Sequence, residues 1–303
     1  LINSILTLYL TLKNQSNDYA MVKTCLVCKA TKFRSIYNAT LLKCDSCGFV
    51  TANMEIDPKI LQQTYTENYF KGEEYVDYLR DKEILQTNFK KRLDYIFKKI
   101  GKAAVTNTLE IGCAYGFFAE TLTQEIKNVR YIGYDVVPEA IDYGKQELNQ
   151  NLVCGDYLEA KVEKKVSDVF MWDVIEHLPD PEKFIEKAAG ELQQGGRIYI
   201  TTGDIERFIP RMQKAKWRMI HPPSHLHYFS KKTLSKLLEN HGFKITDVSY
   251  PPVYRSIRLI YYSLFMLRKK YPGIVEKTYN LIPAKMNIAI NTYDILFLIA
   301  EKK

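Results

Sequence analysis

The chain has 303 residues, of which 46% are hydrophobic and 26% are charged. These values are ordinary for a globular protein with a substantial core, built as one large domain or as a medium domain with a small appendage. The formal net charge is +8, which favours an anionic partner such as nucleic acid, a sugar nucleotide or a membrane surface without choosing among them. No run of about eighteen apolar residues follows the N-terminal segment, so we expect a soluble protein without a membrane-spanning helix.

The first twenty residues form a segment of their own. Residues 1–12 are mostly apolar, but they are too few to span a bilayer, and no basic region precedes them. The chain does not begin with methionine, and its first methionine is Met21. We therefore expect residues 1–20 to be a disordered leader or upstream segment. A weak membrane anchor is the alternative.

Four of the six cysteines form two pairs with the spacing of metal ligands. Two residues separate Cys25 from Cys28 and Cys44 from Cys47, and fifteen residues lie between the pairs. Thiolates on two tight turns suit tetrahedral zinc, so we predict a structural zinc ribbon over residues 21–56. This use of cysteine indicates a reducing, cytoplasmic setting rather than a secreted disulfide framework.

A helical linker or cap is expected over residues 57–104, because apolar residues recur at helical spacing between 77 and 100 and Gly101 can end that helix. Short apolar segments then alternate with helical ones. Strands are expected at 108–111, 129–134, 152–154, 166–172, 197–202, 243–250 and 292–300, and helices at 117–125, 138–149, 181–193 and 231–241. This alternation predicts an α/β domain over residues 105–303, with a parallel sheet covered by helices and with insertions at 203–230 and 251–291.

The first of these strands ends in a glycine loop. Parallel sheets bind ligands at the carboxyl ends of their strands, and glycines there let the backbone approach a ligand closely. The loop Gly112-Cys113-Ala114-Tyr115-Gly116 lacks the three glycines of the dinucleotide fingerprint G-x-G-x-x-G. Glu110 beside it suits a ligand with an ammonium group better than one with phosphates.

Three more strands end in acids. Asp135 can accept hydrogen bonds from both hydroxyls of a ribose, Asp156 is placed to accept from an adenine amino group, and Asp173 flanks the central region of such a ligand. A single acid here could equally be a solvated turn or a helix cap. Acids at successive strand ends, in this order, indicate one shared ligand.

Residues 105–202 resemble the core of class I S-adenosylmethionine-dependent methyltransferases. The segment 110–116 resembles the first motif of the family, Asp135 its ribose acid, Gly155-Asp156 its adenine contact, and residues 168–178 (DVFMWDVIEHL) its fourth-strand motif. Ala114 departs from the usual glycine. The resemblance implies a Rossmann-like sheet, mostly parallel with the last strand antiparallel, and a set of cofactor-binding residues. They are Glu110, Gly112, Cys113, Ala114, Gly116, Asp135, Asp156 and Asp173.

The ribbon, the segment Tyr65-Thr66-Glu67-Asn68-Tyr69-Phe70 and the core together resemble a bacterial and archaeal subgroup of zinc-ribbon methyltransferases. That subgroup is associated with sugar, polysaccharide or lipid-carrier modification. The resemblance implies S-adenosylmethionine and structural zinc as cofactors, and a small-molecule or glycan acceptor: a sugar, a sugar nucleotide or a lipid-linked glycan. Tyr65 and Tyr69 either close over the cofactor or pack. The alternatives are an RNA methyltransferase that binds nucleic acid through its ribbon, and a non-catalytic binding module.

Histidines are the candidate general bases, because a hydroxyl acceptor needs a base with a pKa near neutrality. His177 follows the fourth strand, and His225 and His227 lie in residues 221–230 (HPPSHLHYFS), which follow the fifth strand. All three are catalytic or substrate-binding candidates, and structural hydrogen bonding is the alternative for each. The Asn/Asp-Pro-Pro-aromatic motif for methylation of base amines is absent after the fourth strand, and no Pro-Cys pair serves cytosine chemistry.

Both insertions are rich in cations. Residues 255–270 combine five Arg and Lys residues with aromatic and aliphatic ones, and we expect a helix packed on the core or a dimer contact. Peripheral contact with an anionic membrane or with a lipid-linked substrate is the alternative. The basic stretch 207–218, which includes Trp217, is a candidate for shaping an acceptor pocket for phosphate.

Overall fold

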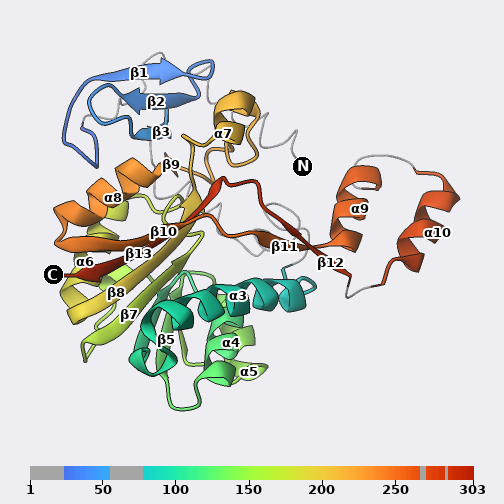
Figure 1. The fold of residues 1–303 in the computed structure, drawn as a ribbon, viewed down its shortest axis with the longest axis horizontal. Coiled ribbons are helices and arrows are strands. Elements are labelled where there is room, and N and C mark those ends of the chain that lie inside the picture. The colour runs from blue at the N-terminus through green and yellow to red at the C-terminus, as the bar shows by residue number, and fades with distance from the viewer. Residues whose placement is uncertain (1–23, 55–77, 267–270, 284–285) are drawn as a thin grey trace.

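The computed structural model describes residues 24–54, 78–266, 271–283 and 286–303. Its centre is a seven-stranded sheet in the order β10-β13-β8-β7-β4-β5-β6. The strands are β4 (Asn107–Ile111), β5 (Arg130–Asp135), β6 (Leu152–Cys154), β7 (Val166–Trp172), β8 (Leu192–Gly203), β10 (Phe243–Ser249) and β13 (Ile295–Lys302). Neighbours from β8 to β6 are parallel, whereas β13 is antiparallel to both β8 and β10. The predicted mostly parallel sheet with an antiparallel last strand is confirmed (Figure 1).

The strand order reverses beside β4, because the chain proceeds from β4 outward to β6 and then returns to β7. In open parallel sheets this reversal creates a crevice at the carboxyl ends of the central strands, where ligands bind. The predicted glycine loop and the turn after β7 both lie at this edge.

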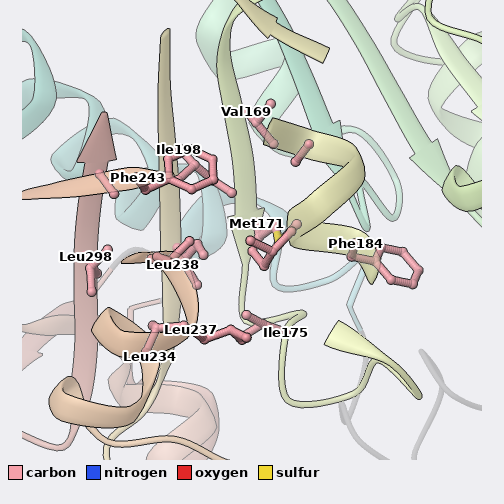
Figure 2. Packing of buried hydrophobic residues seen from close by; sticks show 14 of the residues in the cluster. Val169, Met171, Ile175, Phe184, Ile198, Leu234, Leu237, Leu238, Phe243 and Leu298 are labelled. Atoms are coloured by element: carbon pink, nitrogen blue, oxygen red, sulfur yellow. The ribbon is translucent and has the colours of Figure 1, made fainter. Parts of the chain in front are cut away.

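Helices cover both faces of the sheet. They are α3 (Lys82–Ile100), α4 (Phe117–Glu125), α5 (Pro138–Gln146), α6 (Pro181–Glu191) and α8 (Lys231–Asn240). Alternate residues of β7 pack in the cores on the two faces of the sheet, since successive side chains of a strand point to opposite faces. Phe170 and Trp172 belong to a core shared with α3, α4 and α5, whereas Val169 and Met171 pack with α6 and α8. Figure 2 shows the second core, with Phe184 of α6 near Met171.

Local capping fixes where α6 and α8 begin. The Asp180 side chain accepts a hydrogen bond from the amide of Lys183, and Pro181 occupies the first turn of α6. Ser230 and Thr233 form a reciprocal capping box at the start of α8. The buried histidine-rich loop therefore ends at a fixed point directly before α8.

The cysteine-rich segment forms a small second sheet that includes a strand from the main domain. Its strands are β1 (Phe33–Ile36), β2 (Leu41–Cys44), β3 (Val50–Ala52) and β9 (His227–Tyr228), in that order. Val50 pairs with Tyr228 and Thr51 pairs with His227, both antiparallel. Cys25, Val27 and Phe49 also enter the core beneath α6 and α8. The predicted ribbon is thus structurally continuous with the large domain.

The two insertions differ in character. The first contains α7 (Phe208–Gln213), the 3-10 turn η4 (Lys214–Lys216) and β9, and it packs beside the ribbon; η2 (Lys102–Ala104) and η3 (Tyr157–Glu159) are single 3-10 turns elsewhere. The second contains β11 (Val253–Ser256), α9 (Ile257–Phe265), α10 (Gly273–Leu281) and β12 (Asn287–Ile290). It projects from the body as a separate lobe (Figure 1). Among the described residues no helix is both long and apolar enough to cross a bilayer.

Candidate active site

The glycine loop after β4 has an unusual backbone. Gly112, Ala114 and Gly116 have φ angles of 75°, 46° and 76°, in the left-handed region that favours glycine. A Cβ atom on Gly112 would lie 2.4 Å from Cγ2 of Val174, so only glycine lets the turn after β7 approach this closely. The loop and the turn that leads to His177 are therefore in direct contact.

Two carboxyl groups lie beside this loop, buried Glu110 and half-buried Asp135. Glu110 is 2% exposed and accepts a hydrogen bond from the Tyr131 hydroxyl. Asp135 at the end of β5 accepts hydrogen bonds from the amides of Ala114 at 2.8 Å and Val137 at 3.0 Å. Burial raises the pKa of both acids, and that of Glu110 reaches about 8 because burial acts together with the neighbouring Asp135. Such a pair favours a cationic ligand, since nearby positive charge stabilises the ionised carboxylates.

The raised pKa of Glu110 predicts a pH dependence of stability. Between the unfolded value of 4.5 and the folded value of about 8, the folded protein retains a proton that the unfolded chain releases. The free energy of unfolding should therefore fall as the pH rises through this range, by up to about 1.4 kcal/mol per pH unit for this group. Glu110→Gln should remove that part of the slope, as measured by urea unfolding from pH 5 to pH 8. Exposed Glu147→Gln is the matched control, and an unchanged slope in Glu110→Gln would contradict the assignment.

The other predicted cofactor residues lie near the same edge in different surroundings. Asp156 is exposed after β6 and accepts a hydrogen bond from the Leu158 amide at 2.8 Å. Asp173 follows β7 with a φ of 56° and forms a 3.3 Å ion pair with Arg92 of α3. Cys113 is buried, and burial raises the pKa of its thiol. A thiol that stays protonated is a packing group rather than a nucleophile.

Aromatic side chains surround the loop on the α3 side. Tyr78 stacks on Tyr115 and Phe117, with ring centroids 5.6 Å and 5.4 Å away. The Arg92 guanidinium lies 5.1 Å from the centroid of the Trp172 ring. Residues that precede the core in sequence therefore contact both ends of the predicted cofactor region.

Three histidines converge at the turn after β7. The ring centroids of His177 and His225 are 4.4 Å apart, and those of His221 and His225 are 3.9 Å apart. Nδ1 of His177 lies 2.9 Å from the carbonyl oxygen of Ser224. Because a carbonyl only accepts, this nitrogen carries the proton and Nε2 keeps its lone pair. Burial lowers the pKa of His177 to about 4 and that of His225 well below its ordinary value, so both rings are neutral at physiological pH.

His227 lies apart from this cluster, at the contact between the ribbon and the large domain. It is 3% exposed, and its Nδ1 lies 3.1 Å from the Thr51 hydroxyl oxygen. Its ring centroid is 5.7 Å from that of Phe49. The arrangement places this side chain between β9 and β3, in the setting of a structural residue.

The four paired cysteines converge in the ribbon. Sγ of Cys25 lies 3.5 Å from Sγ of Cys47, and Sγ of Cys28 lies 3.6 Å from Sγ of Cys44. All four sulfur atoms lie within 4.8 Å of one another. Four thiols in two C-x2-C turns are the donor set that tetrahedral zinc prefers, and these residues fit such an ion.

A basic cavity separates the ribbon from the first insertion. It has a volume of about 390 Å³, and its lining includes Tyr37, Lys43, Arg211 and Lys214. Lys43 forms a 3.6 Å ion pair with Glu206, which also lines the cavity, and Arg218 of the insertion forms an ion pair with buried Asp294 at 2.6 Å. Arg211 and Lys214 therefore supply most of the positive charge that this cavity offers to a ligand.

Comparison with known proteins identifies the family. A family model described as "Methyltransferase domain" matches residues 81–248, which is more than half of the chain. The chain belongs to this methyltransferase family.

The individual relatives align with only part of this chain. The ubiquinone biosynthesis O-methyltransferase of Xylella fastidiosa (strain M23) is 28% identical over 118 residues, which are 37% of this chain and 47% of the relative. The Shigella flexneri serotype 5b (strain 8401) protein of the same description is 24% identical over 190 residues, or 55% and 76% of the two chains. The alignment thus spans about half the length of the first of these relatives.

A solved structure shares the fold. Magnesium protoporphyrin IX methyltransferase from Synechocystis PCC 6803, with bound SAH, aligns with 82% of this chain and 100% of its own, with a TM-score of 0.53 and 13% identity. At this identity the likeness concerns the fold alone.

In the structure, the predicted donor-site and catalytic residues fall into three groups. Glu110, Asp135 and the loop between β4 and α4 lie together, His177 and His225 lie together, and His227 lies with the ribbon. The predicted Tyr65 and Tyr69 fall outside the described residues. Tyr78 and Arg92 could not be assigned from the sequence, because no motif marks an aromatic or a cationic residue on a helical segment. Their only signal was proximity in sequence to the core.

Proposed function

We propose that this chain transfers a methyl group from S-adenosylmethionine to a hydroxyl or a carbon atom of a sugar, a sugar nucleotide or a lipid-linked glycan. The observation that carries the proposal is the neutral histidine cluster at the turn after β7. A hydroxyl acceptor must lose a proton as it attacks, and an unprotonated imidazole nitrogen can accept one. Burial holds the pKa of His177 at about 4, below the near-neutral value expected from the sequence, so this imidazole is a weaker base than a solvated one. The relatives compared above are ubiquinone biosynthesis O-methyltransferases, which supports chemistry at oxygen.

The residues of the chain divide the work between donor and acceptor. Bound S-adenosylmethionine supplies a methyl group on a sulfonium sulfur, which a nucleophile displaces in line. Glu110 and Asp135 hold the donor through its ammonium group and its ribose hydroxyls. His177 or His225 accepts the acceptor proton at a ring nitrogen as the new bond to carbon forms. The cavity with Lys43, Arg211 and Lys214 suits an acceptor that carries phosphate.

The proposal includes a structural zinc ion held by Cys25, Cys28, Cys44 and Cys47. The ion would hold the two cysteine turns together in a module too small to have a core of its own. Its role would be to fix the position of β3, the strand with which β9 pairs. No step of the reaction passes through the ion.

The histidine assignment predicts a loss of turnover without a loss of donor binding. His177→Asn and His225→Asn should each reduce methyl transfer by about 100-fold and leave the calorimetric Kd for S-adenosylmethionine unchanged. Because the folded pKa of His177 is about 4, its imidazole stays unprotonated from pH 8 down to pH 6. Protonation of this residue should therefore not reduce the rate in that range.

Activity is measured with radiolabelled S-adenosylmethionine on fractionated cell extract, which identifies the acceptor class at the same time. His241→Gln at the end of α8 is the matched control, since this histidine lies outside the cluster. Label in the RNA fraction, removed by nuclease and with a steep salt dependence, would contradict a sugar acceptor.

A further inference from the structure

The second insertion exposes most of the large hydrophobic side chains on the surface. We call residues 253–266, 271–283 and 286–293 the C-terminal lobe. Twelve large hydrophobic residues are exposed among the described residues of the whole chain, and nine belong to this lobe. They are Leu264, Phe265, Tyr271, Ile274, Leu281, Met286, Ile288, Ile290 and Tyr293. Exposed apolar surface gathered in one place, rather than scattered, marks an interaction site.

The same stretch of sequence carries most of the net charge. Residues 251–293 contain seven cations and one acid, Glu276, so they contribute six of the eight net positive charges of the chain. Three of the cations, Arg255, Arg258 and Lys277, belong to the C-terminal lobe, and the other four lie outside the described residues. The partner of this surface must therefore combine apolar material with negative charge.

The contacts between α9 and α10 are made by aromatic rings, which leaves the aliphatic side chains of these helices exposed to solvent. Tyr279 of α10 packs against Tyr261 and Tyr262 of α9, with ring centroids 6.4 Å and 6.2 Å away. The Arg258 guanidinium lies 5.0 Å from the centroid of the Tyr279 ring. Aromatic rings thus hold the two helices together, and α10 has no buried residue. Leu264, Ile274 and Leu281 are 66%, 67% and 81% exposed.

The two strands of the lobe differ in exposure: β11 is mostly half-buried and Tyr254 exchanges hydrogen bonds with Asn88 of α3, whereas β12 is uncovered. β11 and β12 pair only with each other in the described part of the chain, and all four residues of β12 are exposed. Ile288 and Ile290 of β12 are 45% and 37% exposed. The lobe projects from the sheet domain (Figure 1), so the body of the protein does not block access to it.

We propose that the C-terminal lobe binds the surface of a membrane that contains anionic lipids. Its apolar side chains enter the boundary between headgroups and acyl chains, and its cations lie at the level of the lipid phosphates. Charge decides between this partner and a second copy of the chain: two lobes of the same sign would face each other in a dimer, whereas an anionic bilayer attracts them. The proposal goes beyond methyl transfer and depends on neither the acceptor nor the histidine cluster.

The test is flotation of the full-length protein with lipid vesicles. Wild type should float with vesicles of phosphatidylglycerol and phosphatidylcholine, far less with phosphatidylcholine alone, and less as salt is raised. The double variant Leu264→Asp/Ile274→Asp should weaken binding by at least about tenfold, because both side chains become charged at the apolar boundary. Lys277→Glu should weaken it about fivefold or more.

A matched control comes from α7, where Phe208 is 79% exposed outside the lobe. Phe208→Asp should float like wild type. Each variant must also bind S-adenosylmethionine with the wild-type Kd, which shows that it is folded and separates this test from the proposed function. Two results would overturn the proposal: wild type that does not float with anionic vesicles, or a Leu264→Asp/Ile274→Asp variant that floats as well as wild type. So would a dimer in sedimentation that these substitutions dissociate, since it would identify a second copy as the partner.

Discussion

Asp135→Ala should weaken S-adenosylmethionine binding by roughly 100- to 10,000-fold. The carboxylate at the end of β5 is expected to accept two charge-assisted hydrogen bonds from the ribose hydroxyls, each worth about 1.5 to 3 kcal/mol. It also fixes the loop, because it accepts hydrogen bonds from the amides of Ala114 and Val137. Its removal therefore costs both the ligand contact and the shape of the loop. Isothermal titration calorimetry measures the effect directly.

Two further variants separate these contributions. Asp135→Asn keeps one oxygen acceptor and the size of the side chain, so its loss should be smaller than that of Asp135→Ala. Asp142→Asn removes an exposed acid from the neighbouring helix α5 and should leave binding unchanged. If Asp135→Ala stays folded and binds the donor normally, the ribose is held elsewhere.

Cys44→Ser should abolish zinc binding and methyl transfer together while leaving donor binding nearly intact. A structural zinc site contributes apparent binding energies of about 10–16 kcal/mol, which here would be the folding energy of the ribbon. Cys44 is 1% exposed and belongs to the core beneath α6 and α8. Loss of β3 would remove the only strand that pairs with β9 in the described residues, and β9 directly follows His225. The donor loop packs in the other layer, with α4 and α5.

The measurements are zinc content by mass spectrometry, expected at about one ion per chain, together with turnover and donor Kd. Cys154→Ser is the matched control, because this cysteine is exposed at the end of β6 and outside the cluster. A zinc-free Cys44→Ser protein with full turnover would refute a structural role for the metal.

Much of the main sheet follows from the sequence for a physical reason. The strands β6 and β7 and the helix α4 occur where apolar runs are bounded by glycine, proline or acidic residues. Because these signals are local in sequence, tertiary contacts do not override them. The convergence of the candidate donor residues was predictable because parallel strands bring their carboxyl ends to one edge. Glu110 and Asp135 thus lie together although 24 residues separate them in the chain.

Features created only by tertiary contact could not be predicted. β9 is two residues long, and nothing local marks it as a strand, because its pairing partner β3 is far away in sequence. Alternation along that strand turns His227 toward Thr51, away from the other histidines. Arg92 is similar: its periodicity places it on a helix, but its ion pair with Asp173 depends on how α3 lies across the sheet.

The pairing of β3 with β9 bears on how this architecture can change over generations. The change in composition near residue 56 looks like a border between two exchangeable units. A chain shortened to begin at residue 57 would leave β9 with an unpaired edge and would uncover Phe229, whose ring centroid lies 5.3 Å from that of Phe49. The cysteine-bearing segment and the loop before α8 must therefore be inherited as a matched pair. We expect a ribbon exchanged on its own to be tolerated only if its β3 edge still pairs with β9 and packs against Phe229.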